Sequence, residues 1–272
     1  MRIDGSTIVV TGASSGIGEA LAPMLAERGA TVGIAARRAD RLESTLARCR
    51  RHAPASRSWT VDLADLDAAE QFVIDAWNVF GAVDCLINNA AIGKRKLLAD
   101  HTAADLDAVM RTNFLSPVRM NLAVLPKMIE RGSGTIVNVA SGGGRFGIAH
   151  ESAYCASKFA LSGWSEVAAM DLADAPIEVK LVQPGAIATE IWIQQPGELP
   201  GLAGAEFTTA EKCAAGIVDA LETDGFEFFV PADLKAHVDL KNSDLPAWID
   251  LMAGLGRDTP GVARATSRQD DD

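Results

Sequence analysis

The chain has a single tyrosine and four cysteines in 272 residues, and it has no run of 18 apolar residues. The cysteines, Cys49, Cys85, Cys155 and Cys213, form no Cys-x-x-Cys pair and no metal-ligand spacing. We therefore expect free thiols, no metal site and a reducing compartment. Because a long apolar run and a basic-then-apolar start are both missing, we expect a cytoplasmic protein with no membrane span and no standard export signal.

Basic residues are also scarce, with 25 Lys and Arg against 36 Asp and Glu and a net charge of −11. This balance argues against nucleic acid and an anionic membrane as partners. The short cluster Lys94-Arg95-Lys96 is the main exception. We interpret it as a solvated loop, with the rim of a ligand pocket as the alternative. At 48% hydrophobic residues the chain can bury a large core, and we predict one domain over residues 1–262 followed by a disordered acidic tail over 263–272.

The only tyrosine, Tyr154, precedes Lys158 by four residues in a run without proline. Residues four apart share one face of a helix, so the phenol and the ammonium can share a site. A nearby cation favours the phenolate and lowers the phenol pKa, which suits proton transfer near neutral pH. For an isolated Tyr-x-x-x-Lys, a surface lysine one turn after a half-buried tyrosine is the simpler interpretation.

A glycine-rich turn lies near the N-terminus, where the β-branched run Thr7–Thr11 leads into Gly12, Gly16 and Gly18. Glycines allow a tight turn and a close approach of the backbone to a pyrophosphate, and a following helix supplies free N–H groups. The spacing is Gly-x-x-x-Gly-x-Gly rather than the G-x-G-x-x-G of the standard fingerprint. A short strand before the turn and a helix after it favour a dinucleotide site.

Strand and helix patterns alternate along the chain, which predicts a doubly wound, Rossmann-like parallel sheet of seven strands in one domain. Ligands of such sheets bind at the carboxyl ends of the strands. Polar or glycine-rich residues follow six of the predicted strands, as expected for a site there. The predicted strands are 7–11, 31–36, 57–61, 84–88, 134–140, 177–183 and 226–230, and the predicted helices are 17–29, 39–51, 65–80, 102–131, 152–174 and 208–223.

Taken together, these motifs resemble the short-chain dehydrogenase/reductase family over residues 5 to 231. The resemblance rests on motifs that occur in family order, with Ala91 in place of the usual glycine after Asn88-Asn89-Ala90 as one departure. The motifs are Thr11-Gly12-Ala-Ser-Ser-Gly16-Ile-Gly18, Asp62, Asn88-Asn89-Ala90, Asn113, Ser141, Tyr154-x-x-x-Lys158 and Pro184-Gly185-x-x-x-Thr189.

The resemblance implies hydride transfer between a nicotinamide cofactor and a carbonyl or alcohol. It assigns Ser141 to the substrate oxygen, Tyr154 to proton transfer, Lys158 to the nicotinamide ribose and Asn113 to a water linked to Lys158. Asp62 is expected near the adenine, with a helix cap as the alternative. The residues expected to bind the cofactor are Gly12, Ser14, Ser15, Gly16, Ile17, Gly18, Arg37, Asp62, Leu63, Asn89, Ala90, Tyr154, Lys158, Pro184, Gly185, Ile187 and Thr189.

The end of the second predicted strand indicates which cofactor is used. An NAD-preferring site commonly has a carboxylate about 20 residues after the glycines, whereas this chain has Ala36 there, followed by Arg37. A missing carboxylate removes a repulsive charge, and an arginine fork suits a 2′-phosphate. We therefore expect NADP(H) rather than NAD(H). The alternative is that Arg37 and Arg38 begin a solvated helix.

The expected lid over 187–207 carries Ile191, Trp192 and Ile193, which favours a bulky apolar substrate. Ser141, Phe146, Tyr154 and Trp192 are the expected substrate contacts, and Arg145 and His150 are further polar candidates. Packing of the lid against the body is the alternative role for its apolar side chains. An apolar C-terminal segment, 232–256, is expected to cover the pocket or join a subunit interface.

Three functions remain open from the sequence. An NADP-dependent oxidoreductase is favoured, because a non-catalytic NADP-binding regulator does not need Ser141, Tyr154 and Lys158 together. A sugar-nucleotide epimerase or dehydratase of the extended relatives usually has a longer substrate domain than the 40 or so residues after the last predicted strand provide. Apolar positions such as Leu122 and Val167 on the two long helices favour a homodimer or homotetramer.

Overall fold

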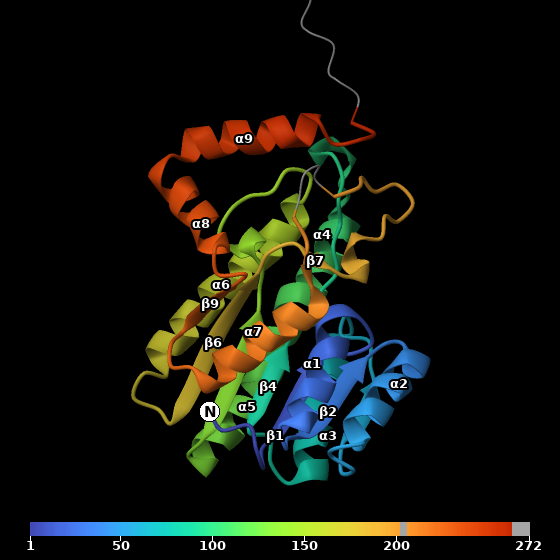
Figure 1. Cartoon of the computed structure of the whole chain (residues 1–272), viewed down its shortest axis with the longest axis vertical. Helices are drawn as coiled ribbons and strands as arrows, with labels where there is room; N and C mark the ends of the chain where they lie inside the picture. The colour runs from blue at the N-terminus through green and yellow to red at the C-terminus, as the bar shows by residue number, and fades with distance from the viewer. Residues whose placement is uncertain (202–205, 263–272) are drawn as a thin grey trace, which may run out of the picture.

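The computed structural model describes residues 1–201 and 206–262, and a seven-stranded sheet with the order β3-β2-β1-β4-β5-β6-β9 forms its centre (Figure 1). All neighbouring strands are parallel, which confirms the predicted doubly wound fold. The strands are β1 (Thr7–Thr11), β2 (Thr31–Ala36), β3 (Arg57–Thr60), β4 (Cys85–Asn88), β5 (Gly134–Val139), β6 (Ile177–Pro184) and β9 (Glu227–Val230).

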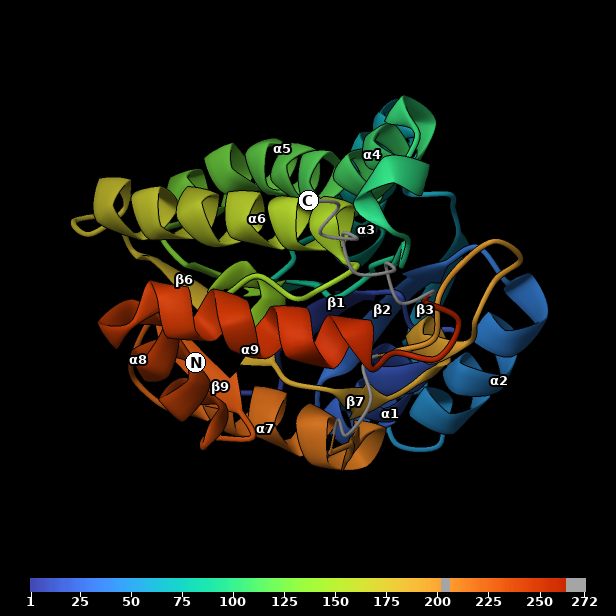
Figure 2. The ribbon, with the colours of Figure 1, turned by 90° about the horizontal axis from the view of Figure 1, so that it is seen from above.

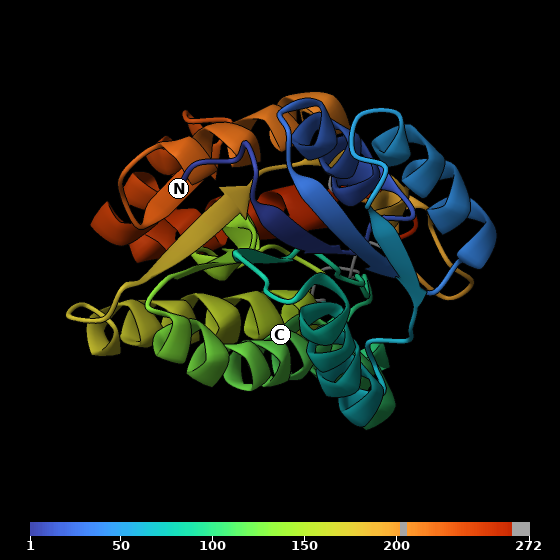
Figure 3. The same cartoon turned by 90° about the horizontal axis from the view of Figure 1, so that it is seen from below.

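Helices cover both faces of the sheet. One face carries α1 (Gly16–Glu27), α2 (Ala39–Arg50) and α7 (Ala210–Glu222). The other carries α3 (Leu66–Phe80), α5 (Ser116–Arg131) and α6 (Ser152–Asp171) (Figure 3). Alternation along β1 explains the two layers, since Ile8 and Val10 pack into the core under α1 and Val9 packs into the core on the opposite face.

The predicted helix 102–131 is wrong as one continuous element. It consists of α4 (Ala103–Met110), a π-helical turn (Arg111–Leu115) and α5. A π-turn inserts an extra residue into the helical ladder and is frequent at functional sites. Asn113 lies in this turn and is buried, so the break positions a candidate site residue.

The C-terminal segment forms two helices, α8 (Leu234–Ser243) and α9 (Leu245–Arg257), beyond the carboxyl ends of the strands (Figure 2). The indole N–H of Trp248 in α9 donates to the carbonyl of Gly147 at 3.1 Å. The lid begins with the short strand β7 (Ile187–Ala188), which pairs with β8 (Thr208–Thr209), and a 3-10 turn (Glu190–Trp192) follows β7. The sequence predicted neither short strand.

None of the helices in residues 1–201 and 206–262 combines the length and the hydrophobicity that a bilayer crossing requires. Over the same ranges no group of His, Cys, Asp and Glu side chains is arranged to hold a metal. The expected tail, 263–272, lies outside the described residues, as do positions 202–205 of the lid.

Candidate active site

Ser141, Tyr154 and Lys158 converge at the carboxyl end of β5. Ser141 follows this strand, and its hydroxyl oxygen accepts a hydrogen bond from the Gly143 N–H at 3.1 Å. Lys158 is only 2% exposed, and its ammonium donates to the Val139 carbonyl at 2.9 Å. The Lys158 nitrogen also lies 5.7 Å from the centre of the Tyr154 ring. Strand, loop and helix thus bring together the three side chains that the sequence singled out.

Burial controls the protonation of this group. It lowers the pKa of Lys158 to about 7. It also raises the pKa of Tyr154, and this effect exceeds the lowering that comes from the Tyr154 hydrogen bond with Ser141. The predicted lowering of the phenol pKa is therefore reversed, because burial of the phenol itself disfavours its charged form. A phenol in this state keeps its proton near neutral pH and can donate it.

Asn113 fixes the loop after β4 to α6. Its amide oxygen accepts from the Ile92 N–H at 2.9 Å, and its amide nitrogen donates to the Ile92 carbonyl at 2.9 Å and to the Ser157 hydroxyl at 3.1 Å. The side chain is 1% exposed. Asn113 is therefore not a helix-surface amide. It is a buried link from the π-turn to Ser157, the residue that directly precedes Lys158 in α6.

The glycine turn is so closely packed that side chains do not fit there. A Cβ atom at Gly12 would lie 2.8 Å from the Ala90 Cα, and one at Gly18 would lie 2.5 Å from the Gly12 carbonyl oxygen. Gly16 has a φ of +56°, and its Cβ would lie 2.8 Å from the Thr189 side chain. Thr11 ties this turn to the end of β4, since its hydroxyl accepts from the Asn89 and Ala90 N–H groups.

This cradle suits a pyrophosphate. Ser15 at the N-cap of α1 makes no side-chain capping bond, so the side chain that usually caps a helix leaves the first N–H groups of α1 available to an anion. Exposed backbone and a helix N-terminus are the donor set that a dinucleotide needs. The residues of the turn, from Gly12 through Ser14, Ser15 and Ile17 to Gly18, therefore fit a nicotinamide dinucleotide.

Other expected cofactor residues lie around the same edge of the sheet. Asp62 is exposed and accepts from the Ala64 N–H at 3.0 Å, but the N-cap of α3 is Asp65, so the helix-cap alternative for Asp62 is wrong; Leu63 is buried. Pro184 ends β6, and the next N–H, of Gly185, donates to the Val230 carbonyl at 2.9 Å. Ile187 is 3% exposed.

The two arginines after β2 have different surroundings. Arg37 is exposed and makes no side-chain hydrogen bond or ion pair within residues 1–201 and 206–262. The Arg38 side chain reaches the glycine turn, where its Nε lies 3.3 Å from the Ser14 hydroxyl. Arg38 also pairs with Glu190 of the lid at 2.6 Å, and Arg41 of α2 pairs with the same carboxylate. Glu190 thus joins the lid to the rim of the cofactor groove.

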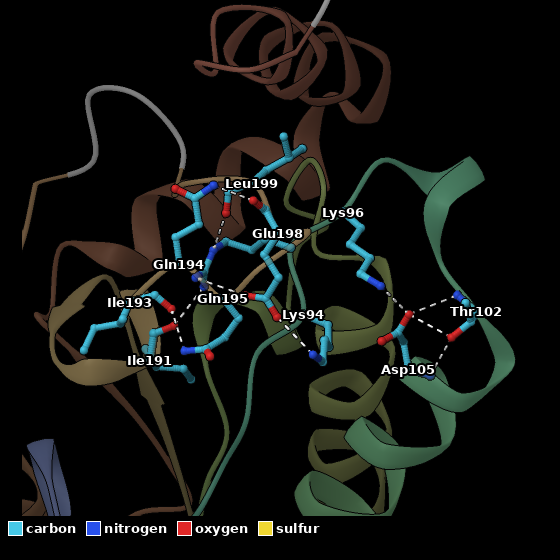
Figure 4. Close-up of polar contacts among 11 residues, drawn as sticks. Lys94, Lys96, Thr102, Asp105, Ile191, Ile193, Gln194, Gln195, Glu198 and Leu199 are labelled. Atoms are coloured by element: carbon cyan, nitrogen blue, oxygen red, sulfur yellow. Dashed lines mark hydrogen bonds and ion pairs between the residues drawn. The ribbon is translucent and has the colours of Figure 1, made fainter.

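The cluster Lys94-Arg95-Lys96 is not a solvated loop. Lys94 lies 3.2 Å from Glu198 of the lid, and Lys96 lies 2.7 Å from Asp105 of α4 (Figure 4). Arg95 is 3% exposed, and its guanidinium donates to the lid carbonyls of Ile191 and Leu199 at 2.9 and 3.2 Å. Lys94 and Arg95 therefore fasten the lid, and Lys96 is held by α4.

Glu151 is a buried acid that sequence reasoning missed. It occupies the N-cap of α6, three residues before Tyr154, and is 6% exposed. Burial raises the pKa of its carboxyl to about 7, although Arg95 opposes this shift. Its position directly before the tyrosine motif was the only signal in the sequence. Its burial depends on neighbouring loops, and the local sequence around Glu151 does not predict where those loops lie.

The side chains expected at the substrate are mostly engaged with the protein. Phe146 packs on Trp248 with ring centres 4.8 Å apart, and the Trp192 indole N–H donates to the Ile187 carbonyl at 2.7 Å. His150 lies 3.0 Å from the Gly256 carbonyl. Arg145 forms ion pairs with Glu166 and Glu227. Trp192 thus bonds within the lid, and the Arg95 guanidinium of the body lies 5.4 Å from the centre of its ring, which favours the alternative in which the apolar lid packs against the body.

Known proteins share this architecture. The model of the short chain dehydrogenase family matches residues 6–198. A ketoacyl reductase of a Nostoc species, HetN, is 31% identical over 229 residues, which cover 84% of this chain and 79% of that protein. A Drosophila melanogaster dehydrogenase/reductase family protein 7-like is 37% identical over 195 residues, and the match covers 70% of this chain and 60% of that protein.

A solved short-chain dehydrogenase from Sphingobium yanoikuyae, in complex with NADPH, superposes with a TM-score of 0.77 at 25% identity, covering 97% of this chain and 99% of that one. Sequence and fold therefore both match this family. The chain belongs to the short-chain dehydrogenase/reductase family and is an NAD(P)-dependent oxidoreductase.

Proposed function

We propose that this oxidoreductase uses NADP(H) to interconvert a bulky, largely apolar carbonyl compound and the corresponding secondary alcohol. The observation that carries the proposal is the convergence of Ser141, Tyr154 and Lys158 at the end of β5, two strands away from β1 and its glycine turn. When bound, the nicotinamide supplies hydride in reduction and accepts it in oxidation. The protein must then stabilise one developing charge and move one proton.

The catalytic side chains divide these tasks. Because the Ser141 oxygen accepts from Gly143, its own proton is available to the substrate oxygen, where a donor stabilises developing negative charge. Tyr154 donates its phenolic proton to that oxygen in reduction and takes it back in oxidation. Lys158 holds the nicotinamide ribose, and Asn113 keeps the loop after β4 against α6 and anchors the water that links Lys158 to solvent.

The rim after β2 supports the choice of NADP(H). Ala36 contributes no carboxylate, and Arg37 and Arg38 follow it. Arg38 is held beside Ser14, whereas Arg37 is exposed at the same edge. Two guanidinium groups and a hydroxyl match a phosphate monoester in charge and in hydrogen-bond donors. Ala36 also leaves the free ribose diol of NAD(H) without its usual acceptor.

Apolar side chains near Ser141 support the substrate class. The Ile148 side chain lies 3.3 Å from the position of a Cβ on Gly143, and the Leu234 side chain of α8 lies 3.2 Å from that on Gly142. Phe146 contacts the same glycine loop. The lid over 187–207 and the cover over 232–256 would close this pocket. Small loop glycines and apolar walls suit a hydrophobic body beside the reacting carbonyl.

We also propose a homodimer or homotetramer in the cytoplasm. On α5 and α6, Leu122 is 57% exposed, Val167 54% and Met170 70%. These positions lie on helices whose other faces cover the sheet, so a second copy is the partner that would bury them. Sedimentation at micromolar concentration that gives only a 28.6 kDa species would remove the assembly proposal.

A carbonyl panel tests the proposed activity. The protein is incubated with NADPH, and in parallel with NADH, and a mixed set of aliphatic, cyclic and aromatic ketones and aldehydes, and oxidation is followed at the nicotinamide absorbance. Turnover of bulky apolar ketones with NADPH supports the proposal. Tight NADPH binding without turnover of any carbonyl or alcohol would instead favour the non-catalytic regulator, and turnover of a sugar nucleotide without net oxidation would favour an epimerase.

A further inference from the structure

A chain of polar contacts extends from Ser141 to the outer edge of the sheet, away from the cofactor. The backbone ladder between β5 and β6 ends where the Ala140 N–H donates to the Val182 carbonyl at 2.8 Å. The next N–H, that of Ser141, donates to the side-chain oxygen of Gln183 at 3.0 Å. A side chain therefore takes over from the sheet at the residue that carries the serine hydroxyl.

The orientation of the Gln183 amide is fixed by its partners. The side chain is fully buried, and its nitrogen donates to Glu227 at 2.9 Å and to the Ser162 hydroxyl at 3.2 Å. A carboxylate only accepts and a backbone N–H only donates. The amide must therefore present nitrogen to Glu227 and oxygen to Ser141. In the reverse orientation, its NH2 group would face the Ser141 N–H, and its oxygen would face the Glu227 carboxylate.

Arg145 closes the chain of contacts into a ring. Its Nε donates to the same Glu227 oxygen at 2.6 Å, and its Nη1 lies 2.5 Å from Glu166 of α6. The Arg145 N–H also donates to the Gly142 carbonyl at 2.9 Å. The loop from Ser141 to Arg145 is thus held at both ends, by Gln183 at one end and by Glu227 at the other.

We propose that Gln183 is a positioning residue for Ser141, and that Glu227 and Arg145 lock the Gln183 amide in the orientation that this task needs. The inference rests on the proposed role of Ser141. It needs neither the NADP preference nor a particular substrate. It also gives Arg145 a different role from the substrate contact expected from the sequence, because the guanidinium is committed to two carboxylates behind the serine.

The test replaces Gln183 by Met, which preserves length and volume but makes no comparable hydrogen bonds. We expect kcat to fall about tenfold, the effect of misplacing one stabilising contact, while KM and the dissociation constant of the cofactor change less than about twofold. Ser162→Ala is the matched control, since it removes another partner of the same amide without touching Ser141. It should leave kcat within about twofold.

The decisive readout is a double-mutant cycle. In a Ser141→Ala background, Gln183→Met should lower kcat no further, because the positioned hydroxyl is already gone. An equal loss in both backgrounds would show a general structural role and overturn the proposal. A normal kcat in Gln183→Met, with Ser141→Ala impaired, would overturn this inference alone. A normal kcat in Ser141→Ala would overturn the role of the serine as well.

Glu227→Gln keeps the test informative if the buried substitution fails to fold. Its side chain is 25% exposed, and the new amide can donate as well as accept, so the Gln183 orientation is no longer enforced. We expect a fall in kcat of about two- to fivefold, again absent in the Ser141→Ala background. An unchanged kcat in a folded Glu227→Gln variant would contradict the locking role.

Discussion

The glycine turn and the lid line the same groove but are built in different ways. Around the glycine turn, backbone lies on backbone, and a single added Cβ at Gly18 would approach the Gly12 carbonyl oxygen to 2.5 Å. Around the lid, charged side chains make the connections, with Glu190 held by Arg38 and Arg41 and Glu198 held by Lys94 and Arg95. The glycine turn is rigid through close backbone contact, whereas the lid is fastened by ion pairs.

This difference separates two properties of the enzyme. Close backbone contact leaves little room for movement, so we expect the cradle and the group at Ser141, Tyr154 and Lys158 to set the chemistry. Ion pairs can exchange partners with an incoming anion or open to water. We therefore expect the lid and the rim after β2 to set which cofactor and which substrate are accepted. Substitutions in the two regions should have separable effects.

Tyr154→Phe should have the largest effect. Loss of the phenolic proton donor should lower turnover by a factor of about 100 or more, while cofactor binding and folding largely survive, because only one hydroxyl is removed. Steady-state kinetics and a cofactor titration of the same preparation measure both. Turnover near that of the wild type would show that another group supplies the proton.

The next largest effect should be a change in cofactor preference, caused only by substitutions at the rim after β2. If Arg37 pairs with the 2′-phosphate, Arg37→Ala should weaken NADPH binding by roughly 1.5–3 kcal/mol, about 10- to 150-fold, with NADH binding nearly unchanged. Ala36→Asp should go further, because it adds a carboxylate against the phosphate. Arg51→Ala, beyond the far end of α2, is the matched control. Equal losses of both cofactors in Arg37→Ala would return that arginine to the role of a solvated helix residue.

Glu151 should make stability depend on pH. The folded state holds the pKa of this carboxyl at about 7, above its ordinary value of 4.5, so the unfolded chain ionises first as pH rises. The free energy of unfolding of the wild type therefore falls between about pH 4.5 and 7, by at most about 3 kcal/mol.

Glu151→Gln lacks this loss and serves as the comparison. In thermal melts, the Tm of the variant should rise relative to that of the wild type by a few degrees between about pH 4.5 and 8. Above that range the difference in Tm should stay constant. A constant difference across all pH values would show that the carboxyl is not held neutral in the folded protein.

Glu190→Gln should give the smallest effect, in the opposite direction to Arg37→Ala. Its carboxylate neutralises Arg38 and Arg41 at the rim, so its loss leaves more positive potential for a phosphate. We expect NADPH binding to tighten by about two- to fivefold, the scale of a half-exposed ion pair, with NADH unaffected. Glu43→Gln on α2 is the matched control. Weaker NADPH binding would mean that the lid carboxylate helps to hold the bound cofactor.

The same contrast explains what the sequence could predict. Strand runs, the glycine turn and the Tyr154 to Lys158 spacing are local patterns, and the structure confirms the sheet that they predicted. The π-turn at Asn113, the burial of Arg95 and Glu151, and the contact between Ser141 and Gln183 arise from segments far apart in the chain. Gln183 looked like an ordinary strand residue, because only its tertiary partners give the amide a direction.

The most direct test of the proposed carbonyl reduction follows the hydride itself. NADPH carrying deuterium at both C4 positions of its nicotinamide is incubated with the protein and a bulky ketone that it turns over, and the alcohol is analysed by mass spectrometry and NMR. We expect one deuterium on the carbinol carbon, at a rate that falls with Tyr154→Phe. Oxidation of the nicotinamide without a labelled carbinol carbon, or labelling at an undiminished rate in Tyr154→Phe, would contradict it.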